Sequence, residues 1–416
     1  MAMAESSGVR RLLVDRIGPV TAISLAQLFG TSLWFSANGA AAGITRAWHA
    51  SATDIGWLTS AVQAGFILGT LTMSLSGVAD RFRASSIFVW SAILGAVFNA
   101  MFALLATGVL SGAMCRFLVG VCLAGIYPMG MKLIVNWAPE KTGTALAQLV
   151  AMLTLGSGLP HALKVVGADW PWQAIIVASS ALALLASVLI AILGDGSRMA
   201  NARRRAAGSA AASSPGILDA LKRPDFRCAA LGYFGHMWEL YAFWTLVPLY
   251  IARSSLAQGV HAGGVSGLSF FVFAAGAVGC LAGGMLSRRI GSAAVAAGAL
   301  AISGTCCVLF ALLWRDASVP LLLVLMLVWG ATVVADSPQF SALSAKACPP
   351  ELVGSALAIQ NSIGFAITVV SISAATALFE KIGLDSSWLL VIGPIAGLLG
   401  FAPVLRRRAS GQASSS

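Results

Sequence analysis

Twelve apolar segments, each long enough to cross the hydrocarbon core of a bilayer, run along almost the whole chain. A helix needs about 20 predominantly apolar residues to span this core. With segments of this length, only α-helices satisfy their own backbone hydrogen bonds in lipid. We therefore predict an all-α polytopic membrane protein with twelve transmembrane helices. They are expected at residues 19–42, 55–78, 86–106, 110–135, 143–166, 170–193, 227–251, 264–286, 291–314, 318–345, 352–379 and 387–405.

The composition agrees with this prediction and excludes several classes of protein. Of 416 residues, 58% are hydrophobic and 10% are charged, which is too apolar for a soluble globule. The 26 Lys and Arg residues outnumber the 15 Asp and Glu residues, but they lie mostly in short loops between apolar segments. A nucleic-acid-binding domain instead gathers its basic residues on one soluble face. We expect a lipid bilayer as the environment and no nucleic acid as a partner.

Lys and Arg are distributed unevenly between alternate loops. With the N-terminus taken as cytoplasmic, 20 of them fall in inner segments and 5 in outer ones, while Arg116 lies within an apolar segment. Cytoplasmic loops of membrane proteins carry the excess of Lys and Arg. We predict a multi-pass membrane protein with both termini in the cytoplasm.

One long hydrophilic stretch divides the twelve segments into two groups of six. It covers residues 194–226 and is rich in Ala, Ser, Gly and Arg, a composition typical of a flexible linker that touches anionic headgroups. We predict an N-terminal six-helix bundle over 1–193, a cytoplasmic linker over 194–226 and a C-terminal six-helix bundle over 227–416.

The seventh apolar segment carries two titratable residues near its middle. His236 and Glu239 lie one helical turn apart. A carboxylate at the centre of a bilayer costs roughly 2.5–3.5 kcal/mol on insertion scales, so it faces protein or water and marks a functional site. Counted from Arg227 at about 1.5 Å per residue, Glu239 lies ~18 Å along its helix, near the midplane. Asp336 in the tenth segment is a second such acid, and Pro338 can kink the helix just after it.

Polar residues recur at helical spacing in the first, fourth, seventh and tenth segments. Residues three, four and seven apart share one face of a helix. The third, sixth, ninth and twelfth segments hold no formal charge at their centres, and Asn99 is the one strong amide among them. This contrast predicts a solute pathway lined by Gln27, Trp34, Asn38, Arg116, Tyr127, His236, Glu239, Trp329 and Asp336. The alternative is that polar groups only join helices, at about 0.6 kcal/mol per hydrogen bond, which suits Asn99 better than Glu239 or Asp336.

Three short motifs lie in two corresponding loops and in the fourth segment. The chain reads SGVADRFRASS between the second and third segments, GGMLSRRIGS between the eighth and ninth, and CRFLVGVCLAG in the fourth. The first and second resemble the Asp-Arg loop signature of the major facilitator superfamily, with Arg288 in place of the second aspartate, and the third fits its R-x-x-x-G-x-x-x-A motif. The resemblance implies two six-helix bundles around a central cavity and a coupling or substrate role for Arg116. It also implies gating by Asp80, Arg81, Arg83, Arg288 and Arg289.

Other segments extend this resemblance. WAPEKTGTALAQ and CPPELVGSALAIQNSIG occupy matching positions in the two halves, as parallel six-helix repeats should. Gln360 and Asn361 in the second of them are added to the expected cavity. GHMWELYAFW and ADSPQFSAL look like segments of bacterial members grouped loosely with nitrate and organic-anion carriers.

These features together predict a secondary active transporter that moves a small organic or inorganic anion by alternating access. Protons would be carried by Glu239, Asp336 and His236, while Arg116 and His236 would attract the anion. HExxH, Cys/His metal-binding and GxxxxGK[ST] motifs are absent, so we expect no enzyme, metal, cofactor or ATP-driven pump. The partners expected are a small-molecule substrate and protons, and the protein is expected to be a monomer. Proton-driven efflux of a small organic compound or drug, passive uniport and a transporter-like membrane sensor remain the alternatives.

Overall fold

The computed structural model describes residues 8, 10–196, 222–260, 263–348 and 353–413. Every regular element within these residues is a helix. The chain divides into two compact units. Unit 1 comprises Met1–Ala50 and Ala61–Ala212, and unit 2 comprises Ser51–Ser60 and Ser213–Ser416. Most of the predicted 194–226 linker, residues 197–221, lies outside the described residues.

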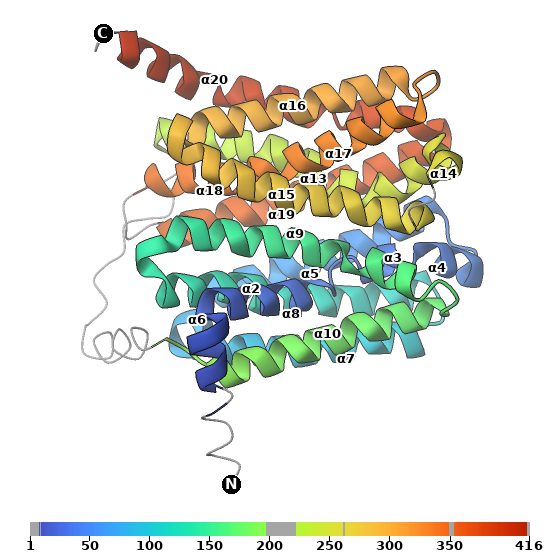
Figure 1. Ribbon diagram of the computed structural model, residues 1–416, viewed down its shortest axis with the longest axis horizontal. Coiled ribbons are helices and arrows are strands. Elements are labelled where there is room, and N and C mark those ends of the chain that lie inside the picture. Colours follow the sequence, from blue (N-terminus) through green and yellow to red (C-terminus); the bar gives the residue numbers. More distant parts are fainter. Residues whose placement is uncertain (1–7, 9, 197–221, 261–262, 349–352, 414–416) are drawn as a thin grey trace. The chain divides into compact units, whose positions relative to one another are not determined.

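Six long or interrupted helices carry the apolar segments of the first half of the chain (Figure 1). The third of them packs against both the fourth and the sixth. In chain order the elements are α2 (Pro19–Thr31), α3 (Ser36–Gly39), α4 (Ala41–Trp48), α5 (Ala52–Leu75), α6 (Val78–Arg81), α7 (Ala84–Leu105), α8 (Val109–Trp137), α9 (Thr142–Val166) and α10 (Trp172–Leu193).

The second half repeats one contact of the first, in which α2 packs against the last two long helices, α9 and α10. The helix α13 (Pro224–Arg253) packs against the last two long helices of the chain, and the tenth segment packs against the eighth and ninth. The other elements are α14 (Leu256–Gly259), α15 (Gly264–Ile290), α16 (Ser292–Leu313), α17 (Val319–Ala335), α18 (Ser337–Lys346), α19 (Val353–Ile382) and α20 (Ile392–Ala413).

The helices account for all twelve predicted spans. Nine helical stretches of the described residues are long and apolar enough to cross a membrane, and one of these, Ala356–Arg407, covers most of both α19 and α20. The remaining two spans are the interrupted first helix, α2–α4, and α13. The middle of α13 is less apolar than the other spans because it carries His236, Glu239 and several tyrosine and tryptophan residues. The chain is therefore an all-α polytopic membrane protein.

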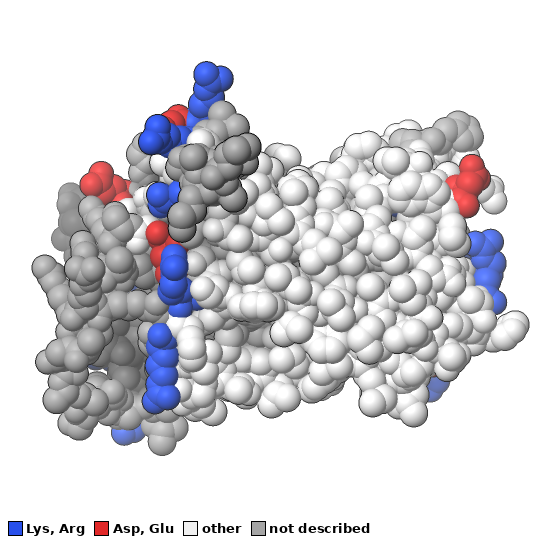
Figure 2. Space-filling view, turned by 90° about the horizontal axis from the view of Figure 1, so that it is seen from below, with Lys and Arg blue, Asp and Glu red and all other residues white. Residues whose placement is uncertain are grey.

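The surface of the described residues matches a membrane environment. On the face that Figure 2 shows, Lys, Arg, Asp and Glu lie near two ends, and the broad surface between them is uncharged. Large apolar side chains such as Leu110 and Leu399 are 79% and 70% exposed. Apolar exposure on this scale is rare on soluble monomers and indicates contact with lipid.

Two of the predicted spans are interrupted. The first was expected as one helix over 19–42, but α2 ends at Thr31 and α3 begins only at Ser36. The tenth is divided at Asp336, between α17 and α18. Pro338 accounts for the second interruption because it lacks the N–H that would continue the helix. The residues between α2 and α3 include no proline, so the first interruption has a tertiary cause, described below.

Glycines allow the closest helix contacts within each unit. In unit 1, a Cβ added at Gly120 of α8 would lie 2.0 Å from the carbonyl oxygen of Val62 in α5. In unit 2, a Cβ added at Gly279 of α15 would lie 2.0 Å from the carbonyl oxygen of Ala331 in α17. Small residues at such contacts let helix backbones approach closely, which is how helices in lipid gain van der Waals packing.

Replacing Gly120 with alanine should therefore push α5 and α8 apart. We expect Gly120→Ala to lower the thermal stability of the purified protein in detergent, by about 1–3 kcal/mol, the usual range for overpacking. Gly298→Ala is the matched control, because it is also inside a helix but its added Cβ would meet nothing within 4 Å. Equal melting temperatures for the two variants would contradict the proposed contact.

Candidate functional site

A buried carboxylate on α13 is bound by side chains from two other helices of unit 2. Glu239 is completely buried. Trp329 of α17 donates its indole N–H to Oε1 of Glu239 at 2.7 Å, and the hydroxyl of Ser303 on α16 donates to Oε2 at 2.9 Å. Phe243, one turn along α13, stacks on the indole of Trp329 with ring centroids 4.2 Å apart. Each carboxylate oxygen thus has its own donor, and the aromatic stack holds one of the donors in place.

The two donors differ in what they allow chemically. An indole N–H can only donate, whereas a hydroxyl can donate or accept. Oε1 therefore accepts from Trp329 in either protonation state of Glu239, and a proton that resides on Oε2 has an acceptor beside it in Ser303. Ser303 can then accept that proton's hydrogen bond and turn its own O–H to the carbonyl oxygen of Leu300, which lies 3.1 Å away. The site can satisfy the carboxyl group in both its ionised and its protonated form.

A second titratable pair joins α13 to the interruption of the tenth span. Nδ1 of His236 lies 2.8 Å from Oδ1 of Asp336, and both side chains are completely buried. Asp336 stands between α17 and α18, and its backbone carbonyl accepts from the N–H groups of Gln339 and Phe340, both at 3.0 Å. Nε2 of His236 has no hydrogen-bond partner among the described residues. The three residues predicted to carry protons, His236, Glu239 and Asp336, are therefore brought together around one stretch of α13.

Arg116 of α8 lies inside unit 1 at the interruption of the first helix. Its side chain is completely buried. Nη2 donates to the carbonyl oxygen of Leu33 at 2.9 Å and to that of Trp34. Nη1 donates to Ser36 at 3.0 Å and to Oδ1 of Asn99 at 2.9 Å. Carbonyls that leave a helix inside a membrane need new partners, and Arg116 supplies them. This is the tertiary cause of the gap between α2 and α3.

Asn99 of α7 extends this arrangement to the sixth helix. Its amide nitrogen donates to the carbonyl oxygen of Ile176 at 2.9 Å and to the hydroxyl of Ser180 at 3.0 Å, both in α10. The hydroxyl of Ser36 also donates to Oδ1 of Asn99 at 2.8 Å. Arg116 and Asn99 thus join α3, α7, α8 and α10 in one buried hydrogen-bond network.

The remaining residues predicted to line a solute pathway are mostly buried. Trp34 donates its indole N–H to Oε1 of Gln63 at 3.0 Å. Asn38 is 4% exposed, and Tyr127 and Asn361 are partly buried. Gln27 and Gln360 are 0% and 1% exposed, and their side-chain amides have no hydrogen-bond partner among the described residues. A buried amide without a partner is unusual in native proteins.

The predicted gating residues lie at helix ends. Arg81 ends the short helix α6, where the Asp80 side chain lies outside the described residues, and Arg288 and Arg289 are exposed at the end of α15. Arg83 lies 3.4 Å from the carboxylate of Asp195.

Asp195 and Ser303 were not expected to have a role. Asp195 also accepts from the backbone N–H of Ser85 at 2.8 Å, so it holds the start of α7 to the end of α10. The position of Asp195 at the start of a hydrophilic linker does not predict its contact with Ser85. Ser303 is one of three hydroxyl residues in a span without charges, with Ser292 and Thr305, and nothing in its spacing distinguished it.

Comparison with known proteins shows one family model and one curated relative that the chain resembles. A family model described as Major Facilitator Superfamily matches residues 23–372. Solute carrier family 22 member 6-A of Xenopus laevis is 29% identical over 123 residues, which is 28% of this chain and 21% of that protein. The chain thus spans about a fifth of the length of this curated relative.

The role of Arg116 in unit 1 can be tested by its removal. Arg116→Gln should lower thermal stability because the carbonyls of Leu33 and Trp34 lose their donors, each at a cost of about 1–3 kcal/mol. Arg46→Gln, at an exposed position of the same unit, should leave the melting temperature nearly unchanged. A melting temperature for Arg116→Gln equal to that of Arg46→Gln would show that Arg116 does not support the interrupted helix.

A double-mutant cycle tests the contact between His236 and Asp336. His236→Gln and Asp336→Asn should each destabilise the protein, while the double variant should be less destabilised than the sum. We expect a coupling of about 0.5–3 kcal/mol, the range for residues in contact. His236→Gln combined with Asp385→Asn provides the control, because Asp385 binds Trp314 and Arg315 instead. Strict additivity in the first cycle would contradict the pairing.

Proposed function

Because the chain belongs to the major facilitator superfamily, and is therefore a secondary transporter of small solutes and not an enzyme, we propose that Glu239 couples its transport to protons. The cycle is alternating access across the bacterial inner membrane, with both termini in the cytoplasm and the protein acting as a monomer. A proton bound at Glu239 while the solute pathway is open to one side is released when the pathway opens to the other.

The observation that carries this proposal is the donor set around Glu239. A carboxylate with only a structural role would be bound by groups that can only donate, which favour its ionised form. Here Trp329 keeps Oε1 as an acceptor, and Ser303 can serve Oε2 either as donor or as acceptor. Gain or loss of a proton at Oε2 then requires only the rotation of one hydroxyl, not the repacking of the helix.

His236 and Asp336 provide a second place where a proton changes the charge near α13. A proton on Nε2 of His236 makes the pair an imidazolium and a carboxylate, and its loss leaves a neutral imidazole beside the acid. Because Asp336 lies at the interruption between α17 and α18, this change acts where the backbone of the tenth span is least constrained by helical hydrogen bonds. We propose that the pair links protonation to movement of α18.

The solute that we propose is a small organic or inorganic anion. Arg116 and His236 are the cations proposed to attract it, but the guanidinium of Arg116 already makes four hydrogen bonds in unit 1, and His236 is paired with Asp336. An anion therefore reaches these cations only in a conformation that exchanges those bonds. Gln27 and Gln360, whose buried amides lack partners among the described residues, are proposed to hydrogen-bond the solute directly.

Glu239→Gln separates proton coupling from solute binding. A glutamine can accept from Trp329 and donate to Ser303, so it reproduces the protonated form of Glu239 permanently. In proteoliposomes screened with a panel of small organic and inorganic anions, we expect the variant to lose accumulation driven by an imposed pH gradient, while exchange of solute at equal pH persists.

Glu140→Gln is the matched control, because it removes an exposed carboxyl group in the short turn between α8 and α9 of unit 1. It should accumulate solute like the unmodified protein. If Glu239→Gln still accumulated a transported solute with the pH gradient, Glu239 would not be the proton carrier. If no gradient moved any solute through the unmodified protein, although solute bound to it, the sensor hypothesis would replace transport.

A further inference from the structure

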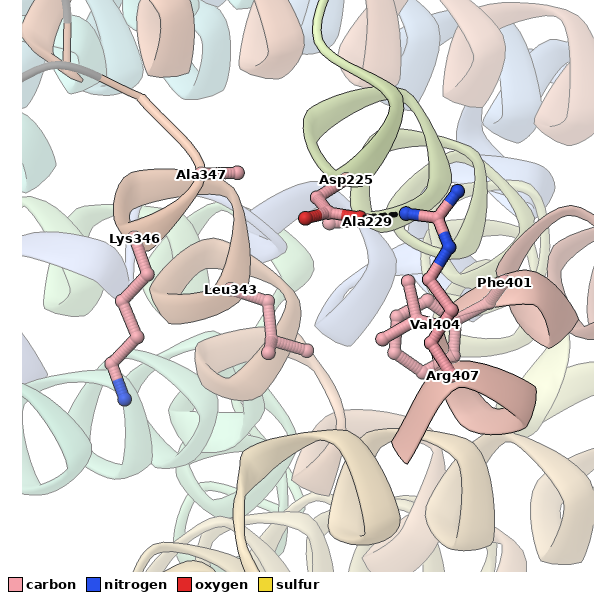
Figure 3. Close-up of a pocket in the computed structure, with 8 residues that line it drawn as sticks. All are labelled: Asp225, Ala229, Leu343, Lys346, Ala347, Phe401, Val404 and Arg407. Carbon is pink, nitrogen blue, oxygen red and sulfur yellow. Dashed lines mark hydrogen bonds and ion pairs between the residues drawn. The ribbon is translucent and has the colours of Figure 1, made fainter. Parts of the chain in front are cut away.

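A small pocket lies at the basic end of unit 2, away from Glu239. It has a volume of about 280 Å³, close to the ~300 Å³ at the lower end of small-molecule sites. Its walls come from the start of α13, the end of α18 and the end of α20. Figure 3 shows Lys346 and Arg407 on opposite sides of the pocket, with Leu343 between them and Val404 and Phe401 beside Arg407.

The charges at the rim favour an anion. Arg407 lies 2.6 Å from Asp225, but both side chains are exposed, at 59% and 66%. Lys346 is also exposed, and Arg223 reaches the same rim by donating to the carbonyl oxygen of Ala347 at 3.4 Å. Three cations therefore surround one acid. Exposed ion pairs contribute little, so an incoming anion can replace Asp225 as the partner of Arg407.

The floor of the pocket is apolar. Phe401 is completely buried, Leu343 is 9% exposed, and Val404 is partly buried. A free inorganic anion gains nothing from contact with such an apolar surface. A ligand that carries a negative headgroup on a hydrocarbon chain satisfies both the rim and the floor.

The pocket opens beside the lipid-facing side of α20. Ile392, Ile395 and Leu399 are 52%, 54% and 70% exposed and, at spacings of three and four, form one stripe along this helix. Arg407 is eight residues beyond Leu399, which at about 100° per residue places it some 80° from that stripe. The basic rim is thus where headgroups meet the end of a membrane helix, and polybasic helix ends attract anionic lipids.

We propose that this pocket binds an anionic phospholipid, whose phosphate meets Arg407 and Lys346 and whose first methylene groups cover Leu343, Phe401 and Val404. The lipid phosphate competes with Asp225 for Arg407. Because that ion pair joins the start of α13 to the end of α20, a bound lipid takes over one of the contacts between these two helices.

Native mass spectrometry of the full-length protein, released from detergent micelles, tests this proposal by titration with phosphatidylglycerol or phosphatidylcholine. We expect one phosphatidylglycerol to bind at least tenfold more tightly than phosphatidylcholine. Lys346→Gln/Arg407→Gln should weaken it about tenfold or more. Arg288→Gln/Arg289→Gln removes the same charge from the same end of unit 2 without touching the pocket, and should retain the lipid.

Asp225→Asn is a second test that does not depend on correct folding of the double variant. It removes the acid that competes for Arg407 and should tighten phosphatidylglycerol binding, by up to about fivefold. Equal weakening of phosphatidylglycerol binding in both double variants would show only a general attraction of the lipid to positive charge. That result would overturn the proposed site. So would unchanged binding in both Lys346→Gln/Arg407→Gln and Asp225→Asn. Thermal stabilisation by inorganic phosphate as strong as that by phosphatidylglycerol would instead assign the pocket to free anions.

Discussion

The rest of this structure depends on one constraint: a charged side chain inside a membrane helix needs groups that bind it. Lipid cannot solvate a carboxylate or a guanidinium there, so each must face protein or water, and here protein groups bind both. Glu239 is bound by an indole and a hydroxyl, and Arg116 by two carbonyl oxygens, a hydroxyl and an amide. These partners come from different helices, so each buried charge also determines which helices must lie together.

In both units a buried charged side chain stands at an interrupted helix. Arg116 donates to the carbonyls released between α2 and α3, and Asp336, paired with His236, occupies the interruption between α17 and α18. Interrupted helices in membranes are tolerated where protein groups satisfy the released backbone. In unit 1 the arginine itself is that group. In unit 2 Pro338 removes a donor, and Asp336, two residues before it, is paired with His236.

This difference separates the two units chemically. The guanidinium of Arg116 remains charged at any physiological pH, so its network in unit 1 holds helices together without responding to protons. The carboxyl groups and imidazole of unit 2 can each gain or lose a proton. The two interruptions therefore hold side chains of different chemistry, a guanidinium in unit 1 and an imidazole paired with a carboxyl group in unit 2.

The sequence by itself determined the number and approximate bounds of the membrane helices, because hydrophobicity over about 20 residues is a local property. It also identified α13 as the helix that carries a buried acid and located the interruption near Pro338. It did not reveal the interruption after Thr31, where no proline stands, or that Trp329, expected to line the solute pathway, donates to Glu239. Tertiary structure decided these features: Ser303 and Trp329 are 64 and 90 residues from Glu239 in the chain. Which hydroxyl or indole meets a given acid depends on how distant helices pack, and no local pattern of residues encodes that.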